Sequence, residues 1–412
     1  MSLKDNVEFL RQLNKLSGLG GVNGDWTASK GDSPLIETAD FGDNPGALRM
    51  LSFVPEGLSG KIPLVVVLHG CTQTATDYEI GAGWCALARR YGFAVLAPEQ
   101  RRSNNPNVCF NWFSSDDIRR DSGEAGSIRA MVEAMATSHP IDRARIFVTG
   151  LSAGGAMTAV MLATYPDVFA GGAVIAGLPY GVAHNVRAGL GAMRHAPTLS
   201  SQELGALVRH ATQHKGPWPK LSVWHGSADR TVDPHNADAL VRQWLDLHGL
   251  TEAPTTKGKV DGQRRLQWKN SSGEIVVESY SIADMAHGTP LGVAANDHPL
   301  GVAGPYLLAA GISSSYHIAQ FFGLTSRVHQ PWAKPAADAA HRSEPHHAEH
   351  GTARAKPRKA ATDLVKDVAY AFKRRPDGHP GSHAGKQNQQ SGRGLDIGGA
   401  INRALTAAGL LK

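Results

Sequence analysis

Apolar positions between residues 40 and 325 are spaced in two ways, which predict strands and helices in alternation. Short runs rich in β-branched residues predict buried strands at residues 63–68, 92–98, 145–149, 173–177, 221–226 and 274–282. Longer stretches with an apolar face predict helices over residues 123–138, about 236–247 and 305–323. This alternation predicts an α/β fold with a mostly parallel central sheet and helices on both faces.

The strand at residues 145–149 runs directly into Gly150-Leu151-Ser152-Ala153-Gly154, and small residues then open a helix. A Gly-x-Ser-x-Gly motif is a weak signal by itself in a chain with 46 glycines, so its context has to carry the inference. Strand, tight turn and helix together are the context of a nucleophile elbow. We predict that Ser152 is a catalytic nucleophile raised above the edge of the sheet.

Two later strands each run into a polar loop, and these loops hold the expected partners of Ser152. Asp229 follows the first strand and His287 the second, in the order Ser, Asp, His that the elbow architecture uses. We expect His287 to take the proton of Ser152 and Asp229 to fix the imidazole tautomer. Asp233 and Asp238 compete with Asp229 for this role, although they also suit a turn and the face of a helix.

The loop after residues 63–68 begins with His69-Gly70-Cys71. In this architecture such a loop supplies one backbone N–H of the oxyanion hole, and the residue after the nucleophile supplies the other. We assign the two donors to the N–H groups of Cys71 and Ala153. His69 is expected to hold the loop by hydrogen bonds rather than to act in catalysis.

Five motifs, in order and spacing, resemble the poly(3-hydroxybutyrate) depolymerase esterases: residues 68–73, 92–100, 109–113, 150–157 and 285–290. The resemblance covers roughly residues 40–325. Feruloyl and acetylxylan esterases are similar in fold and share the elbow and the His-Gly loop. The resemblance implies an α/β-hydrolase fold and a serine hydrolase of carboxylic esters, with the triad and the cysteine oxyanion donor assigned above.

Three functions follow from these observations. The first is an intracellular polyester depolymerase or short-chain esterase, and the second is a feruloyl- or acetylxylan-type carbohydrate esterase. The third is a granule-binding protein whose hydrolase domain has lost its chemistry. The complete set of Ser152, Asp229 and His287 argues against the third, and the loop around His287 favours the first.

Two further segments bear on substrate binding. An insertion at residues 180–220 contains a helical stretch at 202–209, and we expect it to form a lid over the site, a surface decoration being the alternative. Residues 109–113 gather three aromatic side chains, among them Trp112. Because an apolar polyester carries no charge, we expect Trp112 to form an aromatic wall for substrate, with core packing as the alternative.

Composition indicates a globular enzyme followed by a basic segment. The chain has 412 residues, of which 42% are hydrophobic, enough to bury a full α/β core. Residues 331–412 carry 14 basic and 7 acidic side chains, whereas the other 330 carry 28 and 29. We predict a largely disordered basic tail over residues 326–412, with apolar stripes at 362–373 and 395–405 that fold on docking. The charge suggests a granule or another anionic surface as partner, without a specific nucleic-acid site; a solvated tail is the alternative.

The N-terminal extension, residues 1–39, begins with a charged amphipathic stretch that lacks the apolar core of a secretory signal. Three cysteines, Cys71, Cys85 and Cys109, leave at least one thiol free in a monomer. Both features favour a cytoplasmic protein, with granule association or export as alternatives. Secreted relatives of the resembling family use disulfides, so a bridge between Cys71 and Cys109 is left open. No motif indicates a cofactor or a metal, and we expect neither.

Overall fold

The computed structural model describes residues 33–294 and 298–330 of the chain. One ten-stranded sheet organises them, and its strands are β1 (Ile36–Thr38), β2 (Arg49–Phe53), β3 (Ile62–Leu68), β4 (Ala94–Glu99), β5 (Ile141–Leu151), β6 (Gly171–Ile175), β7 (Lys220–Gly226), β8 (Thr256–Val260), β9 (Gln263–Lys269) and β10 (Ile275–Ile282). The spatial order is β1-β2-β4-β3-β5-β6-β7-β10-β9-β8.

The centre of this sheet is parallel and its margins are antiparallel. Strands β4, β3, β5, β6, β7 and β10 pair in parallel, whereas β1 and β2 on one side and β9 and β8 on the other pair antiparallel. The α/β class and the mostly parallel sheet predicted from the sequence are confirmed. Parallel strands end at the same edge of a sheet, so the loops after β3, β5, β7 and β10 meet on one side.

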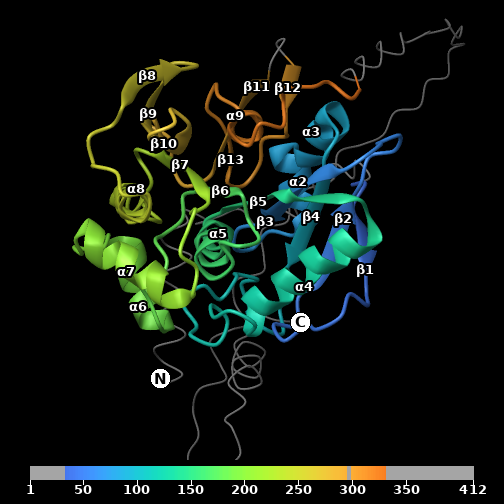
Figure 1. Cartoon of the computed structure of the whole chain (residues 1–412), viewed down its shortest axis with the longest axis horizontal. Helices are drawn as coiled ribbons and strands as arrows, with labels where there is room; N and C mark the ends of the chain where they lie inside the picture. The colour runs from blue at the N-terminus through green and yellow to red at the C-terminus, as the bar shows by residue number, and fades with distance from the viewer. Residues whose placement is uncertain (1–32, 295–297, 331–412) are drawn as a thin grey trace, which may run out of the picture. The chain divides into compact units, whose positions relative to one another are not determined.

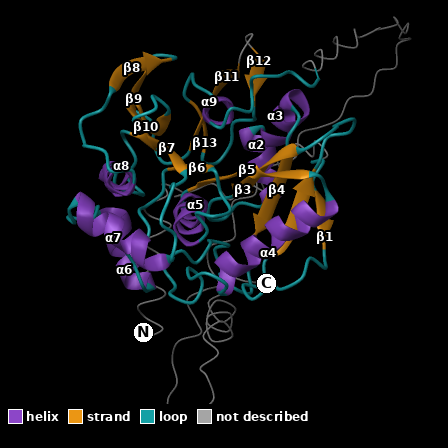
Figure 2. Cartoon of the chain, in the orientation of Figure 1, coloured by secondary structure: helices purple, strands orange, loops and turns teal. Residues whose placement is uncertain are grey.

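Helices cover both faces of the sheet (Figures 1 and 2), and those described are α2 (Ala75–Ala82), α3 (Trp84–Tyr91), α4 (Gly123–Ser138), α5 (Ala153–Thr164), α6 (Val186–Arg194), α7 (Ser201–Ala211), α8 (His235–Leu247) and α9 (Ser314–Phe321). Figure 2 shows α4 and α5 on one side of the central strands and α2, α3 and α9 on the other. None of these helices is long and apolar enough to cross a membrane.

Strand β3 shows why the core has two halves. Leu64, Val66 and Leu68 are buried in the cluster that contains the side chains of α4, α5 and α8. Val65 and Val67 are buried in the opposite cluster, with the side chains of α2, α3 and α9. Because side chains alternate across a strand, an uninterrupted apolar run is what a strand covered on both faces requires.

The prediction of one closing helix over residues 305–323 is wrong. Its first part forms β13 (Leu307–Ala309), which pairs with β11 (Thr289–Ala294); β11 also pairs with β12 (His298–Leu300). Gly311 then adopts a left-handed φ of 74°, and the Ser313 side chain caps α9 by accepting from Tyr316 N–H. Leu307 and Ile312 are both buried, so a short strand and a helix produced one continuous apolar signal.

The ordered fold extends slightly beyond the expected limits of residues 40 and 325. β1 begins at Ile36, and the His329 ring lies 3.1 Å from the Glu56 carbonyl oxygen. The helix expected at 202–209 lies within α7, and the insertion at 180–220 adds α6. Residues 331–412 of the predicted basic tail, with both apolar stripes, and the charged N-terminal stretch lie outside the described residues.

Candidate active site

Ser152 occupies a strained turn between β5 and α5. Its φ of 56° and ψ of −115° lie in a region that residues with a Cβ rarely adopt. Its N–H donates to the Ile175 carbonyl at 2.9 Å, and its own carbonyl accepts from Ala156 N–H at 2.8 Å. The backbone is therefore held from both sides while the side chain stands at the N-terminus of α5.

The glycines around Ser152 are required by close backbone contacts. A Cβ on Gly150 would lie 2.7 Å from the Leu68 carbonyl oxygen, and one on Gly154 would lie 2.5 Å from the His69 carbonyl oxygen. The start of α5 thus sits directly against the loop after β3. This contact brings the turn at Ser152 next to the loop that carries Cys71.

His287 and Asp229 meet beyond the ends of β10 and β7. His287 Nδ1 lies 2.7 Å from Asp229 Oδ2, and both residues are buried. Asp229 Oδ1 accepts the N–H groups of Thr231 and Val232 at 2.8 and 2.9 Å. These contacts fix the orientation of the carboxylate and leave Nε2 as the proton-accepting nitrogen of His287.

The surroundings of Asp229 keep it ionised. Burial by itself would raise the pKa of Asp229, but hydrogen bonds from His225 and His287 outweigh it and hold the pKa well below its ordinary value. The two alternative acids lie elsewhere: Asp233 contacts His235, and Asp238 is exposed on α8. Among the three aspartates considered from the sequence, Asp229 is the one the fold places against His287.

His225 is a neighbour of Asp229 that the sequence analysis missed. It is the penultimate residue of β7, it is 3% exposed, and its Nε2 lies 3.1 Å from Asp229 Oδ2. A histidine inside an otherwise apolar buried strand, four residues before a candidate acid, was the signal that could have found it.

The loop after β3 is fixed by hydrogen bonds of the type expected for His69. Its Nε2 accepts Gln100 N–H at 3.1 Å, so Nδ1 carries the proton and donates to the Gly70 carbonyl at 2.8 Å. Burial lowers the pKa of His69 and keeps the ring neutral. Because Gly70 C=O and Cys71 N–H belong to one peptide plane, this bond also orients the N–H of Cys71.

Two backbone N–H groups, one in the loop after β3 and one at the start of α5, remain available. In the part of the chain that the structure describes, the N–H groups of Cys71 and Ala153 have no hydrogen-bond acceptor, whereas Gly70 N–H donates to Gln73 Oε1 and Thr72 N–H to the Asn107 carbonyl. Free backbone donors at a helix N-terminus and in an adjoining loop are suited to bind a developing negative charge.

Comparison with known proteins agrees with this geometry. The model of the family described as Esterase PHB depolymerase matches residues 49–267. The chain belongs to this family. It is 45% identical over 291 residues to poly(3-hydroxyalkanoate) depolymerase C of Paucimonas lemoignei, covering 70% of each protein. It is also 29% identical over 274 residues to feruloyl esterase B of Talaromyces funiculosus, covering 63% of this chain and 74% of the relative.

Structural comparison identifies the same fold. Acetyl xylan esterase from Aspergillus awamori superposes with a TM-score of 0.60 at 23% identity, over 70% of this chain and 99% of the other. The family and its esterase relatives establish that this protein is a hydrolase of the esterase type.

The esterase contains a disulfide where the sequence left the pairing open. Cys71 and Cys109 are bonded and lie 38 positions apart in the sequence, and Cys85 is buried and free. The bond ties the loop that carries the Cys71 N–H to the aromatic loop at residues 109–113.

Trp112 is packed inside this part of the esterase. It is 7% exposed, and its ring meets that of Phe113 edge to face at 5.5 Å. A Cβ added to Gly189 of α6 would lie 3.4 Å from the Trp112 ring, so helix α6 covers this side. Core packing therefore accounts for the contacts of Trp112, and its substrate role stays a prediction.

Glu124 is a second buried carboxyl group that the sequence analysis did not identify. It accepts the backbone N–H and side-chain N–H of Asn111 at 2.8 and 2.7 Å, and also a hydrogen bond from Gln100. Burial, together with the charge of Asp117, raises the pKa of Glu124 to about 8. The carboxyl group links α4 to the loops that follow β4 and precede Trp112.

Proposed function

We propose that this esterase hydrolyses poly(3-hydroxybutyrate) or its oligomers through Ser152, Asp229 and His287. The observation that carries the proposal is the 2.7 Å hydrogen bond between His287 Nδ1 and Asp229 Oδ2 at the sheet edge where Ser152 occupies its strained turn. The similarity to a poly(3-hydroxyalkanoate) depolymerase over 70% of the chain supports the substrate class.

In the proposed reaction, His287 Nε2 removes the proton of Ser152 Oγ while Oγ attacks the ester carbonyl carbon. The carbonyl oxygen becomes an oxyanion, which the N–H groups of Cys71 and Ala153 stabilise. The tetrahedral intermediate collapses when His287 returns the proton to the departing alkoxide, leaving an acyl group on Ser152. Water, deprotonated by His287, then releases the hydroxy acid and restores Ser152.

A feruloyl- or acetylxylan-esterase activity is the second candidate, because relatives with those names align over more than half of the chain. A catalytically inactive granule-binding protein is the third. A hydrolysis panel separates them: amorphous poly(3-hydroxybutyrate), hydroxybutyrate oligomers, short p-nitrophenyl esters, acetylated xylan and methyl ferulate. We expect the hydroxybutyrate substrates to give the highest kcat/KM, and Ser152→Ala to lower every rate by several orders of magnitude. Preference for ferulate or xylan would contradict the proposal.

The predicted aromatic wall is tested in the same panel. If Trp112 contacts substrate, Trp112→Ala raises KM for oligomers more than for a two-carbon acyl ester. If it only packs in the core, both substrates lose equally and the melting temperature falls. The buried environment of the ring supports the second outcome.

Granule attachment through the basic tail also stays a prediction, because the tail lies outside the described residues. Deleting residues 331–412 should reduce co-sedimentation with hydrophobic granules and leave the hydrolysis of soluble esters unchanged. High salt should weaken the charge-dependent part of the binding. A loss of activity on every ester would show instead that the segment stabilises the enzyme.

The location of the protein is proposed on two opposing arguments. The charged amphipathic N-terminal stretch favours the cytoplasm. The bond between Cys71 and Cys109 favours an oxidising compartment, because cytosolic reductants keep most thiols reduced. Cell fractionation with trapping of free thiols distinguishes the two: one reactive cysteine per denatured chain indicates the oxidised form, and three indicate the reduced form.

A further inference from the structure

Asp229 Oδ2 has two histidine neighbours rather than one. His287 Nδ1 lies 2.7 Å from this oxygen and His225 Nε2 lies 3.1 Å from it. His225 Nε2 also lies 3.0 Å from the Val232 carbonyl oxygen. A carboxylate and a carbonyl are both acceptors, so Nε2 of His225 carries a proton, which it donates to the Val232 carbonyl oxygen while lying 3.1 Å from Asp229 Oδ2. Its Nδ1 is buried without a hydrogen-bond partner among the described residues.

Contacts on both oxygens hold the Asp229 carboxylate. Asp229 Oδ1 is held by the N–H groups of Thr231 and Val232, and His225 bridges Oδ2 to the carbonyl of the same Val232. The carboxylate cannot rotate about its side-chain bond without breaking one of these contacts. These contacts therefore fix the plane of the Asp229 carboxylate independently of His287.

We propose that His225 is a positioning residue for catalysis, which orients Asp229 and moderates the attraction of its carboxylate for a proton on His287. The inference rests on the triad of the proposed function. A second N–H donor on Oδ2 withdraws charge from the oxygen that faces the imidazolium, so His287 can give its proton to the leaving alkoxide more readily. Without the donor, Asp229 would hold a protonated His287 more strongly.

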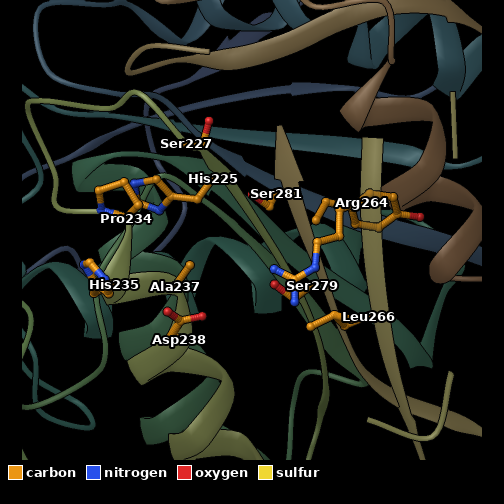
Figure 3. Close-up of a pocket in the computed structure, with 11 residues that line it drawn as sticks. His225, Ser227, Pro234, His235, Ala237, Asp238, Arg264, Leu266, Ser279 and Ser281 are labelled. Carbon is orange, nitrogen blue, oxygen red and sulfur yellow. The ribbon is translucent and has the colours of Figure 1, made fainter. Parts of the chain in front are cut away.

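The surroundings of His225 supply no substitute donor. Its ring lines a pocket of about 430 Å³ between β7, β9, β10 and the start of α8. Figure 3 shows His225 beside Pro234 at this wall. The titratable and charged groups that face the pocket are His235 and Asp238 from α8, Arg264 from β9 and Tyr280 from β10. No hydrogen bond joins any of these four to His225 in the described part of the chain.

Two substitutions separate positioning from packing. His225→Met replaces the ring by an unbranched apolar side chain and removes the donor. His225→Gln retains an N–H donor at the same number of bonds from Cβ. His248→Met is the control, since His248 is a partly buried histidine whose Nε2 lies 3.1 Å from the backbone carbonyl oxygen of Pro219, before β7.

We expect His225→Met to lower kcat about tenfold, the lower range for a hydrogen bond to a charged group, with KM changed less than about twofold. In the plot of kcat/KM against pH, the acidic limb should shift to higher pH by about half a unit or more, because a proton stays on His287 at higher pH. His225→Gln should recover most of the rate and return the limb toward that of the wild type. His248→Met should lower the melting temperature without moving the limb.

The inference is overturned if the acidic limb of His225→Met coincides with that of the wild type, or if His225→Gln is as impaired as His225→Met. Proton NMR gives a readout that does not need turnover: the downfield resonance of the His287–Asp229 hydrogen bond should shift in His225→Met and not in His248→Met. Ser152→Ala is measured in parallel. If Ser152→Ala is inactive and the acidic limb of His225→Met does not shift, only the role of His225 is refuted. If Ser152→Ala remains active, the proposed triad is refuted as well.

Discussion

Replacing Ser152 by glycine should stabilise the protein relative to replacing it by alanine. The backbone at Ser152 has φ 56° and ψ −115°, where a Cβ is crowded by the neighbouring peptide groups. Ser152→Ala removes the hydroxyl and keeps the Cβ, so the strain persists. Ser152→Gly removes both. Neither variant has a hydroxyl at position 152, and the difference between them isolates the backbone strain.

The expected magnitude follows from two opposing contributions. A non-glycine residue in a sparsely populated backbone region costs about 1–3 kcal/mol, which glycine recovers. Glycine also gives the unfolded chain more freedom, which costs about 0.5–1 kcal/mol relative to alanine. The net gain for Ser152→Gly over Ser152→Ala is then about 0–2.5 kcal/mol. For a domain of this size that corresponds to a rise of up to about 5 °C in melting temperature.

Differential scanning calorimetry and urea unfolding at fixed pH would measure this difference. Gly191 of α6 provides a control, because it does not have a positive φ and has nothing within 4 Å of an added Cβ. Gly191→Ala should be neutral or stabilising, opposite in sign to the step from glycine to alanine at Ser152. If Ser152→Gly melts at or below the temperature of Ser152→Ala, the turn is not strained and the reasoning is refuted.

Three further predictions concern Asp229, Glu124 and the disulfide. Asp229→Asn should lower kcat about 10⁴-fold through the wrong histidine tautomer, and steady-state kinetics that show a larger loss for Asp233→Asn would reassign the acid. Burial raises the pKa of Glu124 to about 8, so the folded state retains a proton that the unfolded chain has lost above its ordinary value. The resulting stability is complete at low pH and is lost as pH rises toward 8. Between pH 5 and 8, the free energy of unfolding of the wild type, measured with urea, should fall by about 1 kcal/mol per pH unit relative to that of Glu124→Gln. Parallel pH dependences of the two proteins would contradict this. Replacing Cys71 and Cys109 by serine should cost about 4 kcal/mol, estimated from the 38-residue loop that the bond closes, and should also lower kcat; an unchanged kcat in the folded variant would show that the bond does not position the oxyanion loop.

The sequence predicts the centre of the fold and the order of the site residues because both depend on local patterns. The apolar run of β3 and the Gly-x-Ser-x-Gly turn each carry their own signal within a few residues. Asp229 and His287 are separated by 58 positions, yet the rule that parallel strands end at one edge was enough to bring them together. The hydrogen bond between them depends on the tertiary structure, so the sequence alone provides it only as an expectation.

The parts that were not predicted depend on contacts between distant segments. The apolar residues of β13 suggest part of a helix in the sequence. They form a strand because they pair with β11, and periodicity cannot reveal this partner. Trp112 looked available for substrate, but α6 of the insertion covers it. Glu124 read as an ordinary helix residue in sequence, and only the folded chain surrounds it with donors from Asn111 and Gln100.

Three buried polar side chains lie where strands β3, β4 and β7 pass into their loops. His69 follows β3 and accepts the Gln100 N–H that follows β4, while Gln100 and His225 of β7 each donate to a carbonyl in the loop after their own strand. Apolar burial fixes how close two segments lie but leaves their rotation free, whereas a hydrogen bond also fixes orientation. The proposed oxyanion donor and the proposed carboxylate partner both need a fixed orientation. Polar side chains at these positions therefore suit catalysis better than apolar side chains, even if apolar ones would pack more tightly. Substitutions that preserve volume at His69 or His225 should consequently reduce kcat by a larger factor than their effect on the free energy of unfolding would suggest.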